Sequence, residues 1–128
     1  MRKKRVMIVD DEAITIDICE FILKKNGYDT VSATSGRQCL DYLRNTDSIP
    51  VDLIVLDIEM PILNGFKTLS SIRHAESLKN IPVMFLTATA TQDTVMEAIR
   101  LGVDSYLKKP FLPNELIEKV EALIGKSI

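Results

Sequence analysis

The chain has 128 residues, of which 46% are hydrophobic and 27% are charged, which suits one compact domain and excludes a disordered segment. Its 16 basic and 18 acidic residues leave a formal net charge of −2, which argues against a nucleic-acid-binding module. No apolar run approaches the roughly 18 residues that span a bilayer. The start is basic, but no long apolar segment follows it, so it does not resemble a signal peptide. Cys19 and Cys39 lack metal-type spacing and fit buried thiols in a reducing compartment. We therefore expect one cytoplasmic domain over residues 1–128, with no output domain and no membrane or nucleic-acid partner.

The first part of the chain alternates short apolar runs with amphipathic segments. Its predicted elements are, in order, a strand at 6–9, a helix that ends at Asn26-Gly27, a strand at 28–33 and a helix capped by Ser35 and Gln38. The first helix is expected to bury the face that carries Ile14, Ile18, Phe21 and Ile22. The next strand, 53–57, is a continuous apolar run that ends in an acid, which is typical of a strand covered on both faces.

The second part of the chain repeats the same alternation. After a loop punctuated by Pro61 and Asn64-Gly65, the predicted elements are a helix around 66–72, a strand at 83–86, a helix closed by Gly102, a strand at 105–107 and a last helix from Pro113 to Gly125. The spacing of Val95, Ala98 and Ile99 predicts the fourth of these helices.

Five strands that alternate with five helices predict an α/β fold. Right-handed crossovers would give a five-stranded parallel sheet with helices on both faces, and the common strand order for this length is 2-1-3-4-5. That order places the first strand beside the central strand, 53–57, with a crevice between their carboxyl ends.

Polar side chains stand where four of these strands end. Asp10 and Asp11 follow the first strand, Asp57 ends the central one, Thr87 follows the fourth, and Lys109 follows the fifth. Neighbouring strands lie about 4.8 Å apart, so these groups should meet at one edge of the sheet. Two carboxylates at ~4 Å repel by about 1 to 4 kcal/mol, which a divalent cation or a lysine would offset. Hard oxygen ligands of this kind suit Mg²⁺.

Each of these residues also has a purely structural explanation. Asp57 alone could be a turn former, and Asp10 or Asp11 could cap the first helix. Thr87 alone is an ordinary strand residue, and Lys109 alone is an ordinary surface charge. The functional interpretation depends on all of these residues occurring together, because four separate strand ends place acids, a hydroxyl and an amine at the same edge of the sheet.

The sequence resembles the receiver domain of bacterial two-component response regulators over essentially its whole length. The matching segments are VDDE at 9–12, LIVLDIEMP at 53–61 with NG at 64–65, FLTA at 85–88 and YLKKPF at 106–111. Each segment alone is a weak signal, but their shared order and spacing are highly specific.

The resemblance implies a magnesium-dependent phosphoacceptor site. Asp57 would accept the phosphoryl group, and Mg²⁺ would be bound by Asp11, Asp57 and the backbone carbonyl of Glu59, with Asp10 acting through water. Thr87 and Lys109 would bind phosphoryl oxygens.

It also implies a switch. Thr87 would move toward the phosphoryl group and Tyr106 would move inward, although Tyr106 alone could be ordinary packing. The small Ala88 would leave the acceptor accessible, and Glu59 would modulate attack of water on the phosphoryl group. The Lys109–Pro110 peptide bond would be cis.

The expected partners follow from the same resemblance. A sensor histidine kinase or phosphotransfer protein would dock on the first helix beside Pro110-Phe111. The face formed by the fourth helix, fifth strand and fifth helix would change shape for an effector, for an output domain if the chain is a fragment, or for a homodimer. The domain would catalyse its own phosphorylation and dephosphorylation and would not be a turnover enzyme.

Two other functions share parts of this pattern. A Mg²⁺-dependent small-molecule phosphohydrolase could use the same acids, but so short a chain shows no cap insertion. A flavin binder would need a phosphate cradle where Asp10, Asp11 and Glu12 stand. His74 is expected to be a solvated residue at a helix end, and Gly125-Lys126-Ser127 lacks the first glycine of a P-loop.

Overall fold

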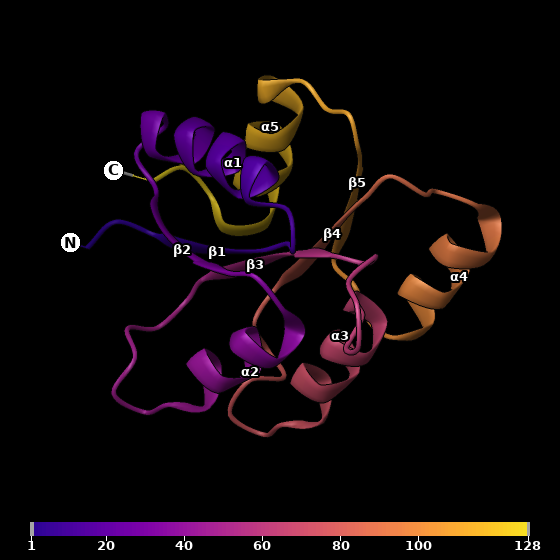
Figure 1. The fold of residues 1–128 in the computed structure, drawn as a ribbon. Helices are drawn as coiled ribbons and strands as arrows, with labels where there is room; N and C mark the ends of the chain where they lie inside the picture. Colours follow the sequence, from indigo (N-terminus) through magenta and orange to yellow (C-terminus); the bar gives the residue numbers. More distant parts are fainter. Residues whose placement is uncertain (1, 128) are drawn as a thin grey trace.

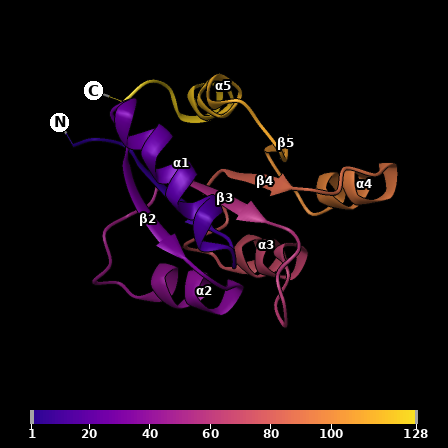
Figure 2. The same cartoon turned by 45° about the horizontal axis from the view of Figure 1, so that its top comes forward.

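The computed structural model describes residues 2–127, which form a single five-stranded sheet flanked by helices. The elements are β1 (Arg5–Val9), α1 (Ala13–Lys25), β2 (Asp29–Ala33), α2 (Gly36–Arg44), β3 (Leu53–Asp57), α3 (Gly65–His74), β4 (Val83–Thr87), α4 (Gln92–Arg100), β5 (Ser105–Lys108) and α5 (Pro113–Ile124). All strand pairs are parallel and the order is β2-β1-β3-β4-β5, so the predicted fold class is confirmed (Figure 1). The arrows of β2, β3 and β4 point the same way in Figure 2, so their carboxyl ends lie at one edge of the sheet.

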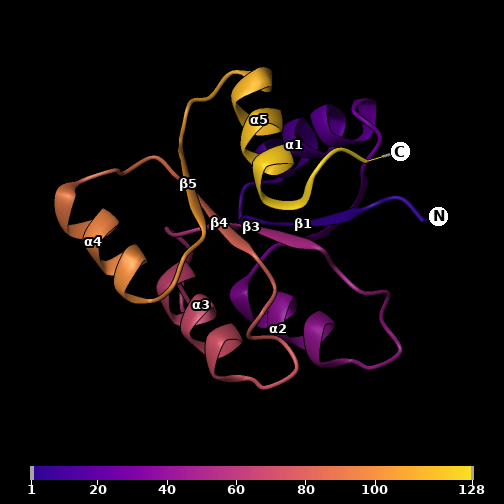
Figure 3. The same cartoon turned by 180° about the vertical axis from the view of Figure 1, so that it is seen from behind.

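The sheet separates two apolar cores. Helices α1 and α5 cover one face, and α2, α3 and α4 lie on the other side (Figures 1 and 3). Successive strand residues alternate between the cores: Val6 packs toward α1 and α5, whereas Met7 packs toward α2 and α3. Burial on both faces explains why the strands are unbroken apolar runs. Within residues 2–127, each helix is too short or too polar to cross a membrane.

Helix α1 forms where the sequence predicts it, but it buries a different face. The residues expected inside are exposed by 68% (Ile14), 48% (Ile18) and 69% (Phe21), and only Ile22 of that set is buried. The buried face carries Ile16, Cys19, Ile22 and Leu23. Because α1 has apolar residues on most of its circumference, periodicity alone does not select the face that meets the sheet. Helix α4 also forms as predicted, and of its apolar residues Ala98 is buried whereas Ile99 is 61% exposed.

The helix caps also differ in part from the expectation. The Ser35 hydroxyl accepts a hydrogen bond from the Gln38 amide, as predicted, but the Gln38 side chain accepts from Thr34 and does not complete a capping box. Neither Asp10 nor Asp11 is the N-cap of α1, because Glu12 occupies that position.

Candidate functional site

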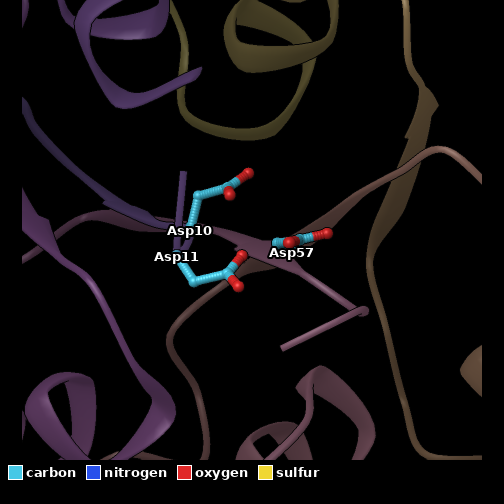
Figure 4. A group of neighbouring side chains, drawn as sticks. All are labelled: Asp10, Asp11 and Asp57. Carbon is cyan, nitrogen blue, oxygen red and sulfur yellow. The ribbon is translucent and has the colours of Figure 1, made fainter. Parts of the chain in front are cut away.

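Three carboxylates gather at the carboxyl ends of β1 and β3. One oxygen from each of Asp10, Asp11 and Asp57 lies within 4.8 Å of the others (Figure 4). The strand register explains the convergence: Val9 pairs with Leu56, so Asp10 and Asp57 continue two adjacent strands. Asp10 is fully buried and Asp57 is 3% exposed, whereas Asp11 is exposed. The sequence-predicted acidic cluster is therefore present.

The loop after β3 is held close to Asp57 by a glycine. The amide of Gly65 donates to the carbonyl of Ile58 at 2.9 Å, where α3 begins. A Cβ at Gly65 would lie 2.5 Å from the carbonyl oxygen of Asp57 and 2.7 Å from the Cα of Ile58. The start of α3 can approach the end of β3 this closely only because residue 65 has no side chain.

Lys109 supplies the positive charge of the site. Its Nζ lies 2.8 Å from Oδ2 of Asp10, 3.7 Å from Oδ1 of Asp57 and 3.9 Å from Oε1 of Glu12. Burial alone would lower the pKa of Lys109, but the hydrogen bond to Asp10 and the surrounding carboxylates outweigh it, so the pKa is raised. Lys109 is therefore held as an ammonium. The Lys109–Pro110 bond is cis, as expected.

Asp57 is strongly perturbed. Its burial, together with the negative charges of Asp10 and Glu59, raises its pKa to about 8, although Lys109 acts in the opposite direction. Without a further positive charge, the carboxylate form of Asp57 is therefore unfavourable at neutral pH. An acid in this state is a candidate functional group, because perturbed titration is concentrated at functional sites.

The side chains of Thr87 and Glu59 are hydrogen-bonded to each other beside Asp57. The buried Thr87 hydroxyl donates to Oε1 of Glu59 at 2.5 Å, and the amide of Thr89 donates to the same oxygen at 3.2 Å. The Glu59 amide in turn donates to Oδ1 of Asp57 at 3.3 Å. Burial opposes ionisation of Glu59, but the hydrogen bonds from Thr87 and Thr89 and the interaction with Asp57 outweigh it, so the pKa of Glu59 is lowered.

Tyr106 is connected to the same loop. Its hydroxyl donates to the carbonyl of Thr89 at 2.8 Å, and its ring packs edge-on against Phe85 with centroids 6.4 Å apart. The side chain is half-buried. The expected switch residues Thr87 and Tyr106 are thus joined through Thr89.

The predicted site residues differ in how closely they associate. The side chains of Asp10, Asp11, Asp57 and Lys109 form one cluster, and Thr87 joins it through Glu59. Ala88 is exposed next to Thr87. Thr89 was missed by the sequence analysis because it contributes its backbone amide and carbonyl, which leave no signal in residue identity.

The donor set fits a small divalent cation. The carboxylates of Asp10, Asp11 and Asp57 offer hard oxygen ligands within one ligand sphere, and Asp11 is accessible from solvent. Burial and the charge of Asp10 keep the pKa of Asp57 raised, although Lys109 acts in the opposite direction. A cation at this position would relieve the remaining repulsion.

Comparison with known proteins gives one consistent result. The chain is similar to the response regulator SaeR of Staphylococcus aureus strain USA300, with 35% identity over 121 residues. That match covers 94% of this chain and 50% of SaeR, so the chain spans about half the length of the curated relatives it matches.

Solved structures agree with this relationship. The chain resembles the chemotaxis protein CheY4 of Vibrio cholerae, with 25% identity and a TM-score of 0.88 over 95% of this chain and 99% of that one. It also resembles a receiver domain protein of Methanospirillum hungatei JF-1, with 26% identity and a TM-score of 0.85 over 94% and 93% of the two chains. The family model of the response regulator receiver domain matches residues 6–121, and the chain belongs to that family.

Proposed function

We propose that this domain is a phosphoacceptor switch in which Asp57 receives a phosphoryl group from a histidine kinase or a phosphotransfer protein. The observation that carries the proposal is the position of Lys109, whose ammonium lies 2.8 Å from Oδ2 of Asp10 and 3.7 Å from Oδ1 of Asp57. A fixed cation beside a nucleophilic carboxylate can stabilise the oxygens of a transferring phosphoryl group.

The transfer exchanges one bond to phosphorus for another. An oxygen of Asp57 forms a bond to phosphorus while the bond from phosphorus to the donor imidazole nitrogen breaks. The electron pair of the broken bond stays on that nitrogen, which leaves as imidazole. The domain contributes mainly by positioning the carboxylate and by neutralising charge, which are the dominant effects in phosphoryl transfer.

We assign the metal to the same edge of the sheet. Asp11, Asp57 and the backbone carbonyl of Glu59 would hold Mg²⁺, with Asp10 assisting through water. When bound, Mg²⁺ would favour the ionised form of Asp57 and neutralise phosphoryl oxygens. This role accounts for an acid whose pKa is raised to about 8 in a site that needs a carboxylate at neutral pH.

Phosphorylation of Asp57 would change the conformation of a surface away from the site. Thr87 and Lys109 would bind the new phosphoryl oxygens, and Tyr106 would rearrange because it is linked to Thr87 through Thr89. The surface of α4, β5 and α5 would then serve an effector, an output domain or a second copy of the chain. Such a local charge event biases a two-state element, so the domain would act as a signal and not as a turnover enzyme.

The exposed face of α1 supports docking of the phosphoryl donor there. Ile14, Ile18 and Phe21 present apolar side chains to solvent, and Ile18 lines a pocket with Lys109, Pro110 and Phe111. A donor bound over this pocket would stand next to the acidic cluster.

The alternative of a small-molecule phosphohydrolase is less well supported. The family match favours a signalling domain. A phosphoacceptor site is sufficient to explain the acidic cluster, so no hydrolase activity is needed to account for it. The two functions differ in stoichiometry, because a phosphoacceptor takes up one equivalent and a hydrolase turns over its substrate.

The test is incubation with acetyl phosphate and Mg²⁺, followed by intact-mass analysis and peptide mapping. We expect one added phosphoryl group at Asp57, which disappears in Asp57→Asn and when EDTA is present. Glu76→Gln, which removes a distant exposed acid, should be phosphorylated like the wild type. Label on another residue, or sustained release of many equivalents of phosphate, would contradict the proposal.

A further inference from the structure

We infer that the carboxylate of Glu59 is an internal anion that occupies the phosphoryl-binding donors of Thr87 and Thr89 while Asp57 is unmodified. The inference rests on the proposed function, since it assigns these two donors to the phosphoryl group. It makes Glu59 a positioning residue that acts through Thr87. Phosphorylation of Asp57 would then have to displace the Glu59 side chain.

The contacts converge on one oxygen atom. Oε1 of Glu59 accepts from the Thr87 hydroxyl at 2.5 Å and from the Thr89 amide at 3.2 Å. A hydroxyl and a backbone amide that point at one anionic oxygen form a small anion-binding pair. The amide of Glu59 donates to Oδ1 of Asp57, so Glu59 contacts the acceptor through its backbone and the two donors through its carboxylate.

The Thr87 hydroxyl can serve only one acceptor at a time. It has a single proton, and two acceptors are within reach: Oε1 of Glu59 at 2.5 Å and the carbonyl of Thr89 at 3.1 Å. The shorter bond, to an ionised group, is the stronger one. Glu59 and a phosphoryl oxygen would therefore compete for the same proton.

The competition extends to Tyr106. The carbonyl of Thr89 accepts from the Tyr106 hydroxyl at 2.8 Å, while the amide of Thr89 is shared between Oγ1 of Thr87 at 3.0 Å and Oε1 of Glu59 at 3.2 Å. Glu59 thus fixes the segment to which Tyr106 is attached. Release of Glu59 would free Thr87 and Thr89 together and loosen the anchor of Tyr106.

Charge makes the two occupants exclusive. A phosphoryl group on Asp57 carries negative charge, and the carboxylate of Glu59 already lies on the donors that this group would use. Two anions cannot share one hydroxyl and one amide without strong repulsion. The cost of removing Glu59 from these donors would weaken binding of a phosphoryl group or of its mimics.

The test compares two substitutions that separate charge from hydrogen bonding. Glu59→Gln removes the charge but keeps an oxygen that accepts from Thr87, whereas Glu59→Ala removes both. Neither changes the backbone carbonyl at residue 59. Binding of beryllofluoride in the presence of Mg²⁺, followed by NMR, reports on occupation of the phosphoryl site without transfer chemistry.

We expect the affinity for beryllofluoride to increase from the wild type to Glu59→Gln and again to Glu59→Ala, with a total gain of about tenfold. The difference between the two variants should shrink when Thr87→Ala is added to both. Glu76→Ala, at an exposed acid beyond the far end of α3, should bind like the wild type. Equal affinities for Glu59→Gln and Glu59→Ala, or an undiminished difference without the Thr87 hydroxyl, would overturn the inference.

A second readout needs neither metal nor phosphoryl mimic. In EDTA, the amide signal of Thr89 and the ring signals of Tyr106 should shift in Glu59→Ala and stay in place in Glu76→Ala. Unchanged signals in Glu59→Ala would overturn the inference even if beryllofluoride binds. If the wild type fails to bind beryllofluoride while the Thr89 signal responds to Glu59→Ala, the proposed phosphoacceptor function fails and the Glu59 contact remains as a structural feature only.

Discussion

The ammonium nitrogen of Lys109 lies 2.8 Å from Oδ2 of Asp10, a carboxylate with no solvent exposure. Removal of one partner of a buried ion pair leaves the other charge desolvated and unpaired. We expect Lys109→Ala to reduce the free energy of unfolding by about 2 kcal/mol, less than for a fully buried pair, because the lysine side chain is 17% exposed. Urea denaturation at pH 7.5 in EDTA measures this loss.

The neighbouring Lys108 provides the control. It is exposed at the end of β5, so Lys108→Ala should change the free energy of unfolding by less than about 0.5 kcal/mol. The loss in Lys109→Ala should also decrease at pH 5, where Asp57, whose pKa is raised to about 8, is protonated. Equal stabilities for the two variants at pH 7.5 would contradict the importance of the pair.

The second prediction concerns Asp57→Asn in metal-free buffer. Because the pKa of Asp57 is raised from 3.8 to about 8, the folded chain binds a proton at this site that the unfolded chain has lost. The stability linked to Asp57 is therefore fully present below pH 4 and is lost as the pH rises to 8. Asparagine is neutral throughout, so the gain from Asp57→Asn should increase over this range and reach about 2 kcal/mol near pH 8.

Thermal melts in EDTA at pH 5, 6.5 and 8 follow this trend. Saturating Mg²⁺ should raise the wild-type melting temperature more than that of Asp57→Asn, because the ion binds only the folded site. A stability gain that is the same at pH 5 and pH 8, or a loss at pH 8, would show that Asp57 is not desolvated as the geometry indicates.

The third prediction tests the close approach at Gly65. In Gly65→Ala the added Cβ would meet the backbone of Asp57 and Ile58 at 2.5 and 2.7 Å, so β3 or α3 must shift. We expect a loss of about 2 kcal/mol in unfolding free energy and a large fall in labelling of Asp57 by acetyl phosphate. Gly102→Ala is the matched control, because its φ of +85° costs about 1 kcal/mol while its Cβ has ordinary contacts. Labelling should persist in Gly102→Ala, and similar labelling in both variants would count against the role of Gly65.

The fourth prediction compares two isoleucines on α1. Ile16 is 6% exposed and Ile18 is 48% exposed, although the two residues are separated by one position. We expect Ile16→Ala to cost about 3 kcal/mol and Ile18→Ala less than about 0.5 kcal/mol. Chemical denaturation measures both, and a larger cost for Ile18→Ala would mean that the helix is rotated relative to this structure.

The same helix shows where inference from sequence reaches its limit. A regular spacing of apolar residues identified α1. More than one face of this helix is apolar, however, because Ile16 points away from the side that carries Ile14 and Ile18. Only the position of the sheet and of α5 decides which face is buried. By contrast, α5 carries a single clear stripe, and its Leu116 and Val120 are buried as predicted.

The acidic cluster was predictable because it depends on strand ends. Parallel strands in the order 2-1-3-4-5 bring Asp10 and Asp57 together whatever their side-chain rotamers are. The contact of Glu59 with Thr87 was not predictable, since it depends on how the loop after β3 turns and on one side-chain conformation. The bonds of Thr89 are made by its backbone and have no counterpart in residue type.

The two cysteines lie on opposite sides of the sheet, Cys19 in the core under α1 and α5 and Cys39 in the core under α2 and α3. Burial raises the pKa of each thiol to about 12, with nearby charges adding a smaller effect at Cys19. Folded molecules should therefore resist alkylation until a layer opens. The rates at which the two thiols become alkylated would report separately how often each of the two cores opens, with no added label or substitution.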